Sequence, residues 1–90
     1  MNSREAKRAK ERRYYQRLRN AVLILYHPCC RQCGFDDRRA LQVDHIYGEG
    51  GKDYRKKGPR GVLIDALRYP RRYQILCANC NTIKGKGRPA

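Results

Sequence analysis

Two short stretches, CRQC at residues 30–33 and CANC at residues 77–80, decide how this chain can fold. Each places two cysteines three positions apart, and 43 residues separate the two pairs. Both sulfurs of such a turn point to the same side, so two pairs can surround one tetrahedral Zn²⁺ ion at about 2.3 Å. A redox-active C-x-x-C needs one pair and a thioredoxin-like pattern, which this chain lacks. The spacing therefore predicts a closed, structural zinc site, whose ligands are Cys30, Cys33, Cys77 and Cys80.

The fifth cysteine, Cys29, directly precedes the first pair. Cys29 could pair with Cys33 as C-x-x-x-C. A tight metal knuckle formed by Cys30 and Cys33 is favoured instead, because Gly34 follows directly and glycine accepts the positive φ that such a turn needs. Cys29 is therefore expected to be a free thiol. A chain of 90 residues buries only about 60% to 65% of its unfolded surface. We therefore expect the protein to unfold when the zinc is removed.

The composition of the chain is strongly basic. The chain has 22 Lys and Arg and 8 Asp and Glu, which gives a net charge of +14. Such an excess of positive charge usually indicates a polyanionic binding partner. Five cysteines without a secretory signal favour metal binding in a reducing compartment over disulfides. The longest apolar run, AVLILY at 21–26, is far shorter than the roughly 20 residues of a membrane span. We expect an intracellular, cytoplasmic protein with a nucleic acid as its partner.

Residues 3–26 are predicted to form a long basic helix. Asn2 is its candidate N-cap, with Glu5 three positions on, and the helix should end near Tyr26 because Pro28 disfavours helical geometry at the residue before it. Apolar residues recur at helical spacing and are expected to face the core, with Lys and Arg opposite. These apolar positions are Tyr14, Leu18, Ala21, Val22 and Leu25. The helix is interpreted as a solvated basic helix packed through its C-terminal half, or as an arm along phosphates, and the two are compatible.

The rest of the chain, residues 27–90, is predicted to be one small zinc-stapled α+β domain. ALQV at 40–43 and YQIL at 73–76 show strand patterns, and the zinc would lay them side by side as an antiparallel pair. Residues 48–61 hold five glycines and five Lys or Arg and are expected to form a basic loop. A two-turn helix is expected at 62–69. The last cysteine pair is expected to run into a short terminal helix.

An acid and a histidine, Asp44 and His45, stand at the end of the first predicted strand. Asn81 follows the last cysteine, so the zinc would seat it nearby. Carboxylate and amide oxygens suit Mg²⁺ or a similar ion, and a neutral imidazole takes a proton from water near pH 7. Neighbours in a strand point to opposite faces, so the strand must break at His45 if the three groups are to converge. An isolated Asp-His pair is usually an ordinary contact; the cysteine pairs and Asn81 favour catalysis.

Three motifs resemble the HNH endonuclease family, also called the ββα-metal or His-metal-finger nucleases: CRQCG, LQVDHI and YQILCANCNTIK, within residues 29–84. The chain looks most like small phage and bacterial members, and its final C-x-x-C-N is similar to that of the recombination endonuclease VII group. The resemblance implies a ββα-metal finger preceded by the basic helix. It also implies that His45 is the general base, that Asp44 and Asn81 bind Mg²⁺ or Mn²⁺, and that the paired cysteines hold structural zinc.

One family residue has no counterpart in this chain. The central asparagine of the family helps to orient the base, and no asparagine occurs from 46 to 76. A backbone carbonyl near Arg72 or the side chain of Gln74 is a candidate to orient His45 in its place. The family's last histidine is replaced by Asn81, which can also ligate the ion.

The basic residues around the predicted site are expected to clamp phosphates on both sides of the scissile one, without reading bases. If about six phosphates are contacted, the logarithm of affinity should fall with the logarithm of salt at a slope near −5. Tyr47 and Tyr54 could stack on sugars or bases, but tyrosines more often fill small cores, and we favour the second role. The phosphate-binding candidates are Lys52, Arg55, Lys56, Lys57, Arg60, Arg71, Arg72, Lys84 and Lys86, with Arg88 in the tail.

The leading interpretation is a metal-dependent DNA endonuclease with weak sequence preference, which nicks DNA or cuts a particular DNA structure. A second interpretation is a non-catalytic zinc-ribbon module that binds DNA or RNA. A third is an accessory subunit of a phage packaging machine, whose nuclease activity needs a partner. A phage-encoded protein would act in the host cytoplasm.

Overall fold

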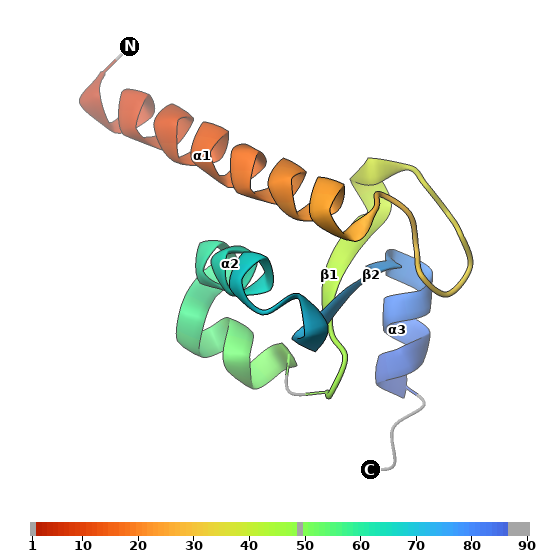
Figure 1. Ribbon diagram of the computed structural model, residues 1–90. Coiled ribbons are helices and arrows are strands. Elements are labelled where there is room, and N and C mark those ends of the chain that lie inside the picture. The colour runs from red at the N-terminus through yellow and green to blue at the C-terminus, as the bar shows by residue number, and fades with distance from the viewer. Residues whose placement is uncertain (1, 49, 87–90) are drawn as a thin grey trace.

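The computed structural model describes residues 2–48 and 50–86, which form a small α+β fold of three helices and a two-stranded antiparallel sheet (Figure 1). Two short 3₁₀ turns precede the strands. The elements in chain order are α1 (Ser3–Tyr26), the 3₁₀ turn Arg38–Ala40, β1 (Leu41–His45), α2 (Gly50–Arg68), the 3₁₀ turn Pro70–Arg72, β2 (Tyr73–Cys77) and α3 (Ala78–Lys86). Among the described residues, no helix combines the length and the apolar character that a bilayer crossing requires.

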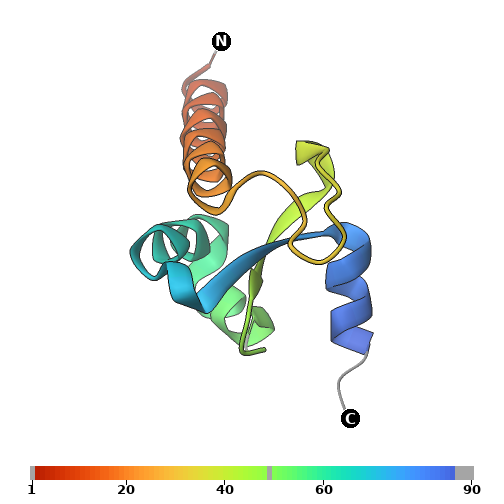
Figure 2. The same cartoon turned by 45° about the vertical axis from the view of Figure 1, so that its right-hand side comes forward.

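The two strands lie between α2 and α3, which cover opposite faces of the sheet (Figures 1 and 2). β1 and β2 pair in register from Leu41 opposite Cys77 to His45 opposite Tyr73, so the predicted antiparallel pair is confirmed. Successive strand residues alternate between the two faces. The odd-numbered residues face α2, as the rings of His45 and Tyr73 do. The even-numbered residues face α3, as Asp44 does.

The limits of α1 follow local signals at both ends. The Asn2 side chain accepts a hydrogen bond from the backbone N–H of Glu5 at 2.8 Å, which satisfies one of the unpaired donors of the first turn. The last helical residue is Tyr26, and His27 takes a φ of 75°, outside the helical region. Both ends are those that the sequence predicts.

The buried face of α1 differs from the predicted one. Val22 and Leu23 are buried, whereas Tyr14 and Leu25 are 43% and 54% exposed and Ala21 also faces solvent. The prediction is confirmed for Val22 and for Leu18, which packs against the core. It was wrong for the other three positions, because the last turns of the helix are apolar on every side. The spacing of apolar residues therefore could not tell which side meets the rest of the molecule.

Polar contacts with distant segments fix the rotation of α1. The guanidinium of Arg19 donates to the backbone carbonyls of Leu41, at 3.0 Å, and of Arg38. The hydroxyl of Tyr26 donates to the carbonyl of Ala66 at 2.7 Å. These bonds satisfy carbonyl groups at the start of β1 and in α2, and they turn the Tyr26 side of the helix inward.

The basic loop predicted at 48–61 is instead largely helical. α2 covers most of this segment and bends at Gly58, whose φ of 73° is far from helical values. Before the bend, Asp53 and Lys57 form an ion pair at 3.0 Å one turn apart, which supports a helix. After the bend, the helix continues through the segment 62–69 predicted to be helical and ends at its penultimate position. The glycine content predicted a loop, because the helix propensities of single residues do not include such side-chain contacts.

A single apolar core fills the space between α1, α2 and the α2-facing side of the sheet. Its members come from every one of these elements, so no element buries its apolar side alone. The buried residues in this space are Val22, Leu23, Leu41, Val62, Leu63, Ala66, Tyr73 and Ile75, and the same cluster continues to Cys30, Leu76 and Cys77.

Candidate functional site

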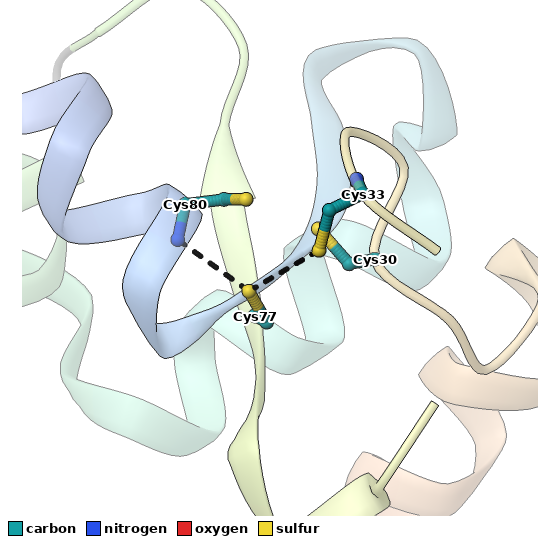
Figure 3. Close-up of side chains that lie close together, drawn as sticks. All are labelled: Cys30, Cys33, Cys77 and Cys80. Atoms are coloured by element: carbon teal, nitrogen blue, oxygen red, sulfur yellow. Dashed lines mark hydrogen bonds between the residues drawn. The ribbon is translucent and has the colours of Figure 1, made fainter. Parts of the chain in front are cut away.

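The four paired cysteines converge at the end of the sheet that adjoins α3. Cys30 and Cys33 come from the loop after α1, Cys77 ends β2, and Cys80 lies in the first turn of α3 (Figure 3). All four sulfurs lie within 4.8 Å of one another, and those of Cys33 and Cys77 are 3.7 Å apart. A tetrahedron with metal–sulfur bonds of 2.3 Å has edges of about 3.8 Å. The cluster could therefore hold a metal ion such as zinc.

The backbone around the cluster has the form of two metal knuckles. The N–H of Cys33 points to the sulfur of Cys30, and the N–H of Cys80 points to the sulfur of Cys77, both at 3.4 Å. Gly34 has the positive φ that the sequence predicts, 80°, and its N–H donates to the carbonyl of Cys30 at 2.8 Å. The two knuckles thus aim their sulfurs at one point.

The electrostatics of the cluster favour a thiolate at Cys30. Burial opposes its ionisation, but hydrogen bonds from the backbone at Cys77, Cys33 and Gln32 outweigh that effect and lower the pKa of the Cys30 thiol to about 6. A thiolate is the form that binds metal. Cys29 stands apart from the quartet with a free thiol, as predicted.

The carboxylate of Asp44 is buried and lies among cation-binding oxygens. Its Oδ2 accepts hydrogen bonds from Nε2 of Gln74 at 2.8 Å and from Nζ of Lys84 at 2.5 Å. The same ammonium group donates to the backbone carbonyls of His45, at 2.7 Å, and of Ile46, at 3.4 Å. Three oxygens at the end of β1 therefore surround one positive charge, which is supplied here by Lys84.

The imidazole of His45 lies on the other face of β1. Its Nε2 is 2.8 Å from Oδ2 of Asp53, and its ring centroid is 4.7 Å from that of Tyr73. A carboxylate only accepts hydrogen bonds, so a neutral ring in this position carries its proton on Nε2 and leaves the lone pair of Nδ1 available. The hydrogen bond from His45 and the ammonium of Lys57 hold the pKa of Asp53 below its usual value.

A second layer of contacts holds Asp53 in place. Nζ of Lys57 bridges Oδ1 of Asp53 at 3.0 Å and Oδ2 of Asp65 at 2.9 Å. The hydroxyl of Tyr73 donates to Asp65 and lies 3.4 Å from Oδ2 of Asp53. The two carboxylates raise the pKa of Lys57, with Asp65 the larger cause. The orientation of His45 is therefore fixed by a connected network of side chains from α2 and β2.

The expected break of the strand at His45 does not occur. His45 pairs with Tyr73 as the last residue of β1, and the chain turns only at Ile46. Asp44 and His45 consequently point to opposite faces of the strand. The amide nitrogen of Asn81 donates to the side chain of Gln42 at 2.6 Å, so Asn81 lies beside β1 on the α3 side. The side-chain hydrogen bond that the described structure gives Asn81 is with Gln42, whereas Asp44 is bound by Gln74 and Lys84.

Both groups suggested as orienting His45 contact other residues. The carbonyl of Arg72 accepts a hydrogen bond from the N–H of Ile46 at 2.9 Å, and Gln74 binds Asp44. Asp53 takes this position instead and was missed. The signal that could have found it is an acid within a basic segment, eight residues after His45.

Several of the predicted phosphate-binding residues are engaged within the fold. Lys57 and Lys84 form the ion pairs described above, and the guanidinium of Arg72 lies 4.7 Å from the ring centroid of Tyr69. The Lys86 side chain and Arg88 lie outside the described part of the structure. Solvent-exposed members of the predicted set are Lys52, Arg55, Lys56, Lys57, Arg60, Arg71 and Arg72.

The two tyrosines near the site do not fill the core. Tyr47 is 81% exposed and Tyr54 is 52% exposed, so the favoured core role was wrong for both. Tyr54 borders the cleft beside β1. Its ring is therefore available to a bound molecule.

A cleft of about 660 Å³ runs along β1. All five residues of β1 line it, with residues of α1 and α2 on one side and residues of α3, including Asn81 and Lys84, on the other. Asp44 and His45 therefore border the same cleft although their side chains leave opposite faces of the strand.

Comparisons with known proteins found no matching family model, no similar curated protein and no similar solved structure.

Proposed function

We propose that the protein is a metal-dependent DNA endonuclease of the ββα-metal type, with low sequence specificity. The observation that carries the proposal is the end of β1, where His45 is held by a carboxylate and Asp44 lies among cation-binding oxygens, both beside one cleft. The net charge of +14 supports a polyanionic substrate. The sequence resemblance to HNH nucleases supports the assignment of roles.

In this proposal the cysteine quartet binds zinc and acts as a scaffold. Four thiolates leave no coordination position for water or substrate, which is typical of structural zinc. The ion would join the loop after α1 to the end of β2 and the start of α3. It would thereby keep Asn81 and Lys84, both on α3, beside the strand that carries Asp44.

His45 is the proposed general base. Nδ1 takes a proton from a water molecule as that oxygen forms a bond to phosphorus, and the opposite P–O bond breaks. Asp53 keeps the Nε2 proton in place and stabilises the imidazolium that forms. A positioned base of this kind contributes about 10²- to 10⁴-fold to a rate.

Asp44 and Asn81 are the proposed ligands of the catalytic Mg²⁺ or Mn²⁺ ion. The oxygens at the end of β1 fit a cation, because they already surround the ammonium of Lys84. A bound divalent ion supplies stabilisation of negative charge on the leaving oxygen. Lys84 must release Asp44 for this, since two cations repel each other at one carboxylate oxygen, and its ammonium then becomes available to the substrate phosphate.

Supercoiled plasmid tests this function. Zinc-loaded protein is expected to convert the plasmid to the open circle when Mg²⁺ or Mn²⁺ is added, and to leave it intact when neither ion is added. Binding of the plasmid without cleavage in either ion would instead support the non-catalytic zinc-ribbon interpretation. The accessory-subunit interpretation predicts cleavage only after a packaging partner is added.

Replacing Asp53 by asparagine is expected to lower kcat by about 10- to 100-fold, the usual effect of removing a carboxylate behind a functional histidine. KM for DNA should change little, because Asp53 orients His45 and the proposal gives it no contact with the substrate. The ¹⁵N chemical shifts of the His45 ring should show loss of the Nε2–H tautomer. Asp65→Asn is the matched control, because Asp65 shares Lys57 and Tyr73 with Asp53, whereas His45 forms its side-chain hydrogen bond, within the described part of the chain, with Asp53. Unchanged kcat and tautomer in Asp53→Asn would contradict the positioning role.

A further inference from the structure

The N-terminal half of α1 extends beyond the apolar core and carries most of the charge of the helix. α1 contains eight Lys and Arg and two Glu, and its buried residues, Val22 and Leu23, lie near its C-terminal end. The helix passes over α2 and projects away from the sheet (Figure 1). The core therefore does not account for the length of α1 or for its charge.

A second hollow, of about 470 Å³, lies between this half of α1 and α2. Arg8 and Arg12 line it from α1, and Arg60 lines it from α2 just after the bend. Among the described residues that line it, Glu11 is the one acid. Three exposed guanidinium groups against one carboxylate leave the hollow with a positive charge.

The two hollows adjoin each other. Tyr15 of α1 and Pro59 of α2 line both of them, so the arginine-lined hollow lies next to the cleft beside β1. The two adjoining hollows are called the trough here, and its lining extends from Asp44 and His45 to Arg8. A nucleic acid bound in the cleft would therefore meet positively charged side chains along the trough toward Arg8.

We propose that this trough receives the DNA strand that flanks the scissile phosphate, and that Arg8, Arg12 and Arg60 neutralise its phosphates. The inference rests on the proposed function, because that function places the scissile phosphate beside β1. Seven residues of helix separate Tyr15 from Arg8, or about 10 Å at 1.5 Å per residue. This length matches about three base pairs at 3.4 Å each, and the trough offers three arginines over it. This path combines Arg60, one of the phosphate-binding residues predicted from the sequence, with the basic helix that the sequence offered as an arm along phosphates.

A DNA-binding assay without turnover tests the trough. His45→Ala protein is used so that the DNA stays intact, and the dissociation constant for a short labelled duplex is measured from low to high salt. In this background Arg8, Arg12 and Arg60 are all changed to glutamine. Each phosphate contact contributes about −0.9 to the slope of log affinity against log salt, so the slope should become less steep by nearly 3. Affinity at 0.1 M salt should fall by about 100-fold or more.

The matched control changes Lys10, Arg13 and Arg17 to glutamine. These residues are also exposed, but they lie on the opposite side of α1 at 100° per residue, and the variant has the same net charge. It should bind DNA close to the level of its parent. Equal losses in the two triple variants, or a larger loss in the control, would overturn the trough. This comparison is independent of cleavage: a selective loss supports the trough even if the plasmid is never nicked, and equal losses reject it even if nicking succeeds.

Discussion

Cys30→Ser is expected to unfold the protein, and removal of the bound metal by a chelator should do the same. The described part of the chain forms a sheet of only two strands, and the cysteine quartet joins the loop after α1, the end of β2 and the start of α3. Zinc contributes about 10 to 16 kcal/mol of apparent binding free energy in small zinc domains. Domains of this size have a total stability of only about 5 to 15 kcal/mol. Loss of the bound ion, which follows when one of its four ligands is removed, therefore takes away a free energy as large as the total stability of such a domain.

The measurements are zinc content per chain and thermal unfolding followed by circular dichroism. Cys29→Ser is the control, because it removes a thiol from the neighbouring position, and Cys29 is outside the quartet. It should retain one zinc ion per chain and the melting temperature of the wild type. A metal-free protein that keeps a cooperative unfolding transition, or a Cys30→Ser variant that melts like the wild type, would show that the quartet does not support the fold.

His45→Ala is expected to reduce the single-turnover rate of DNA cleavage by about 10²- to 10⁴-fold, which corresponds to about 3 to 5 kcal/mol in the activation barrier. The variant lacks the Nδ1 lone pair that we propose takes the proton from the attacking water. Its affinity for DNA should stay close to that of the wild type, since the proposed phosphate contacts come from Lys and Arg. The loss should therefore appear in kcat and not in KM.

The other histidine of the chain serves as the control for this experiment. His27 is exposed at the end of α1 and has a positive φ, so glycine is the replacement that keeps its backbone conformation. His27→Gly should cleave DNA at the wild-type rate. Equal rates in wild type and His45→Ala would show that this histidine is not the base, and any nicking would then come from another group or a contaminating nuclease.

The elements that could be predicted from the sequence are those with local causes. Asn2 caps α1 because its own side chain reaches a nearby backbone N–H, and His27 leaves the helix because proline follows it. Gly34 takes a positive φ within its own knuckle. The cysteine quartet is long-range, yet its spacing is chemically so specific that the partners can be matched without a structure.

The candidate site could be predicted only in part, because its side chains are positioned by elements distant in sequence. Asp44 and His45 are adjacent in the chain, but the regular strand sends them to α3 and α2 respectively. The partner of His45 is Asp53, which lies in a helix where the glycine content predicted a loop. No periodicity or motif of the sequence describes such a contact, since it depends on how α2 packs on the sheet.

The sequence by itself determined the cysteine quartet, the two paired strands, the ends of the first helix and the excess of positive charge. Each follows from short-range geometry, from ligand chemistry or from composition. Only the tertiary structure decided which side of α1 is buried, which carboxylate holds His45, which cation faces Asp44, and where α1 and α2 leave a trough between them. These depend on the rotation and packing of whole helices, which many weak contacts set together and which no single stretch of the chain encodes.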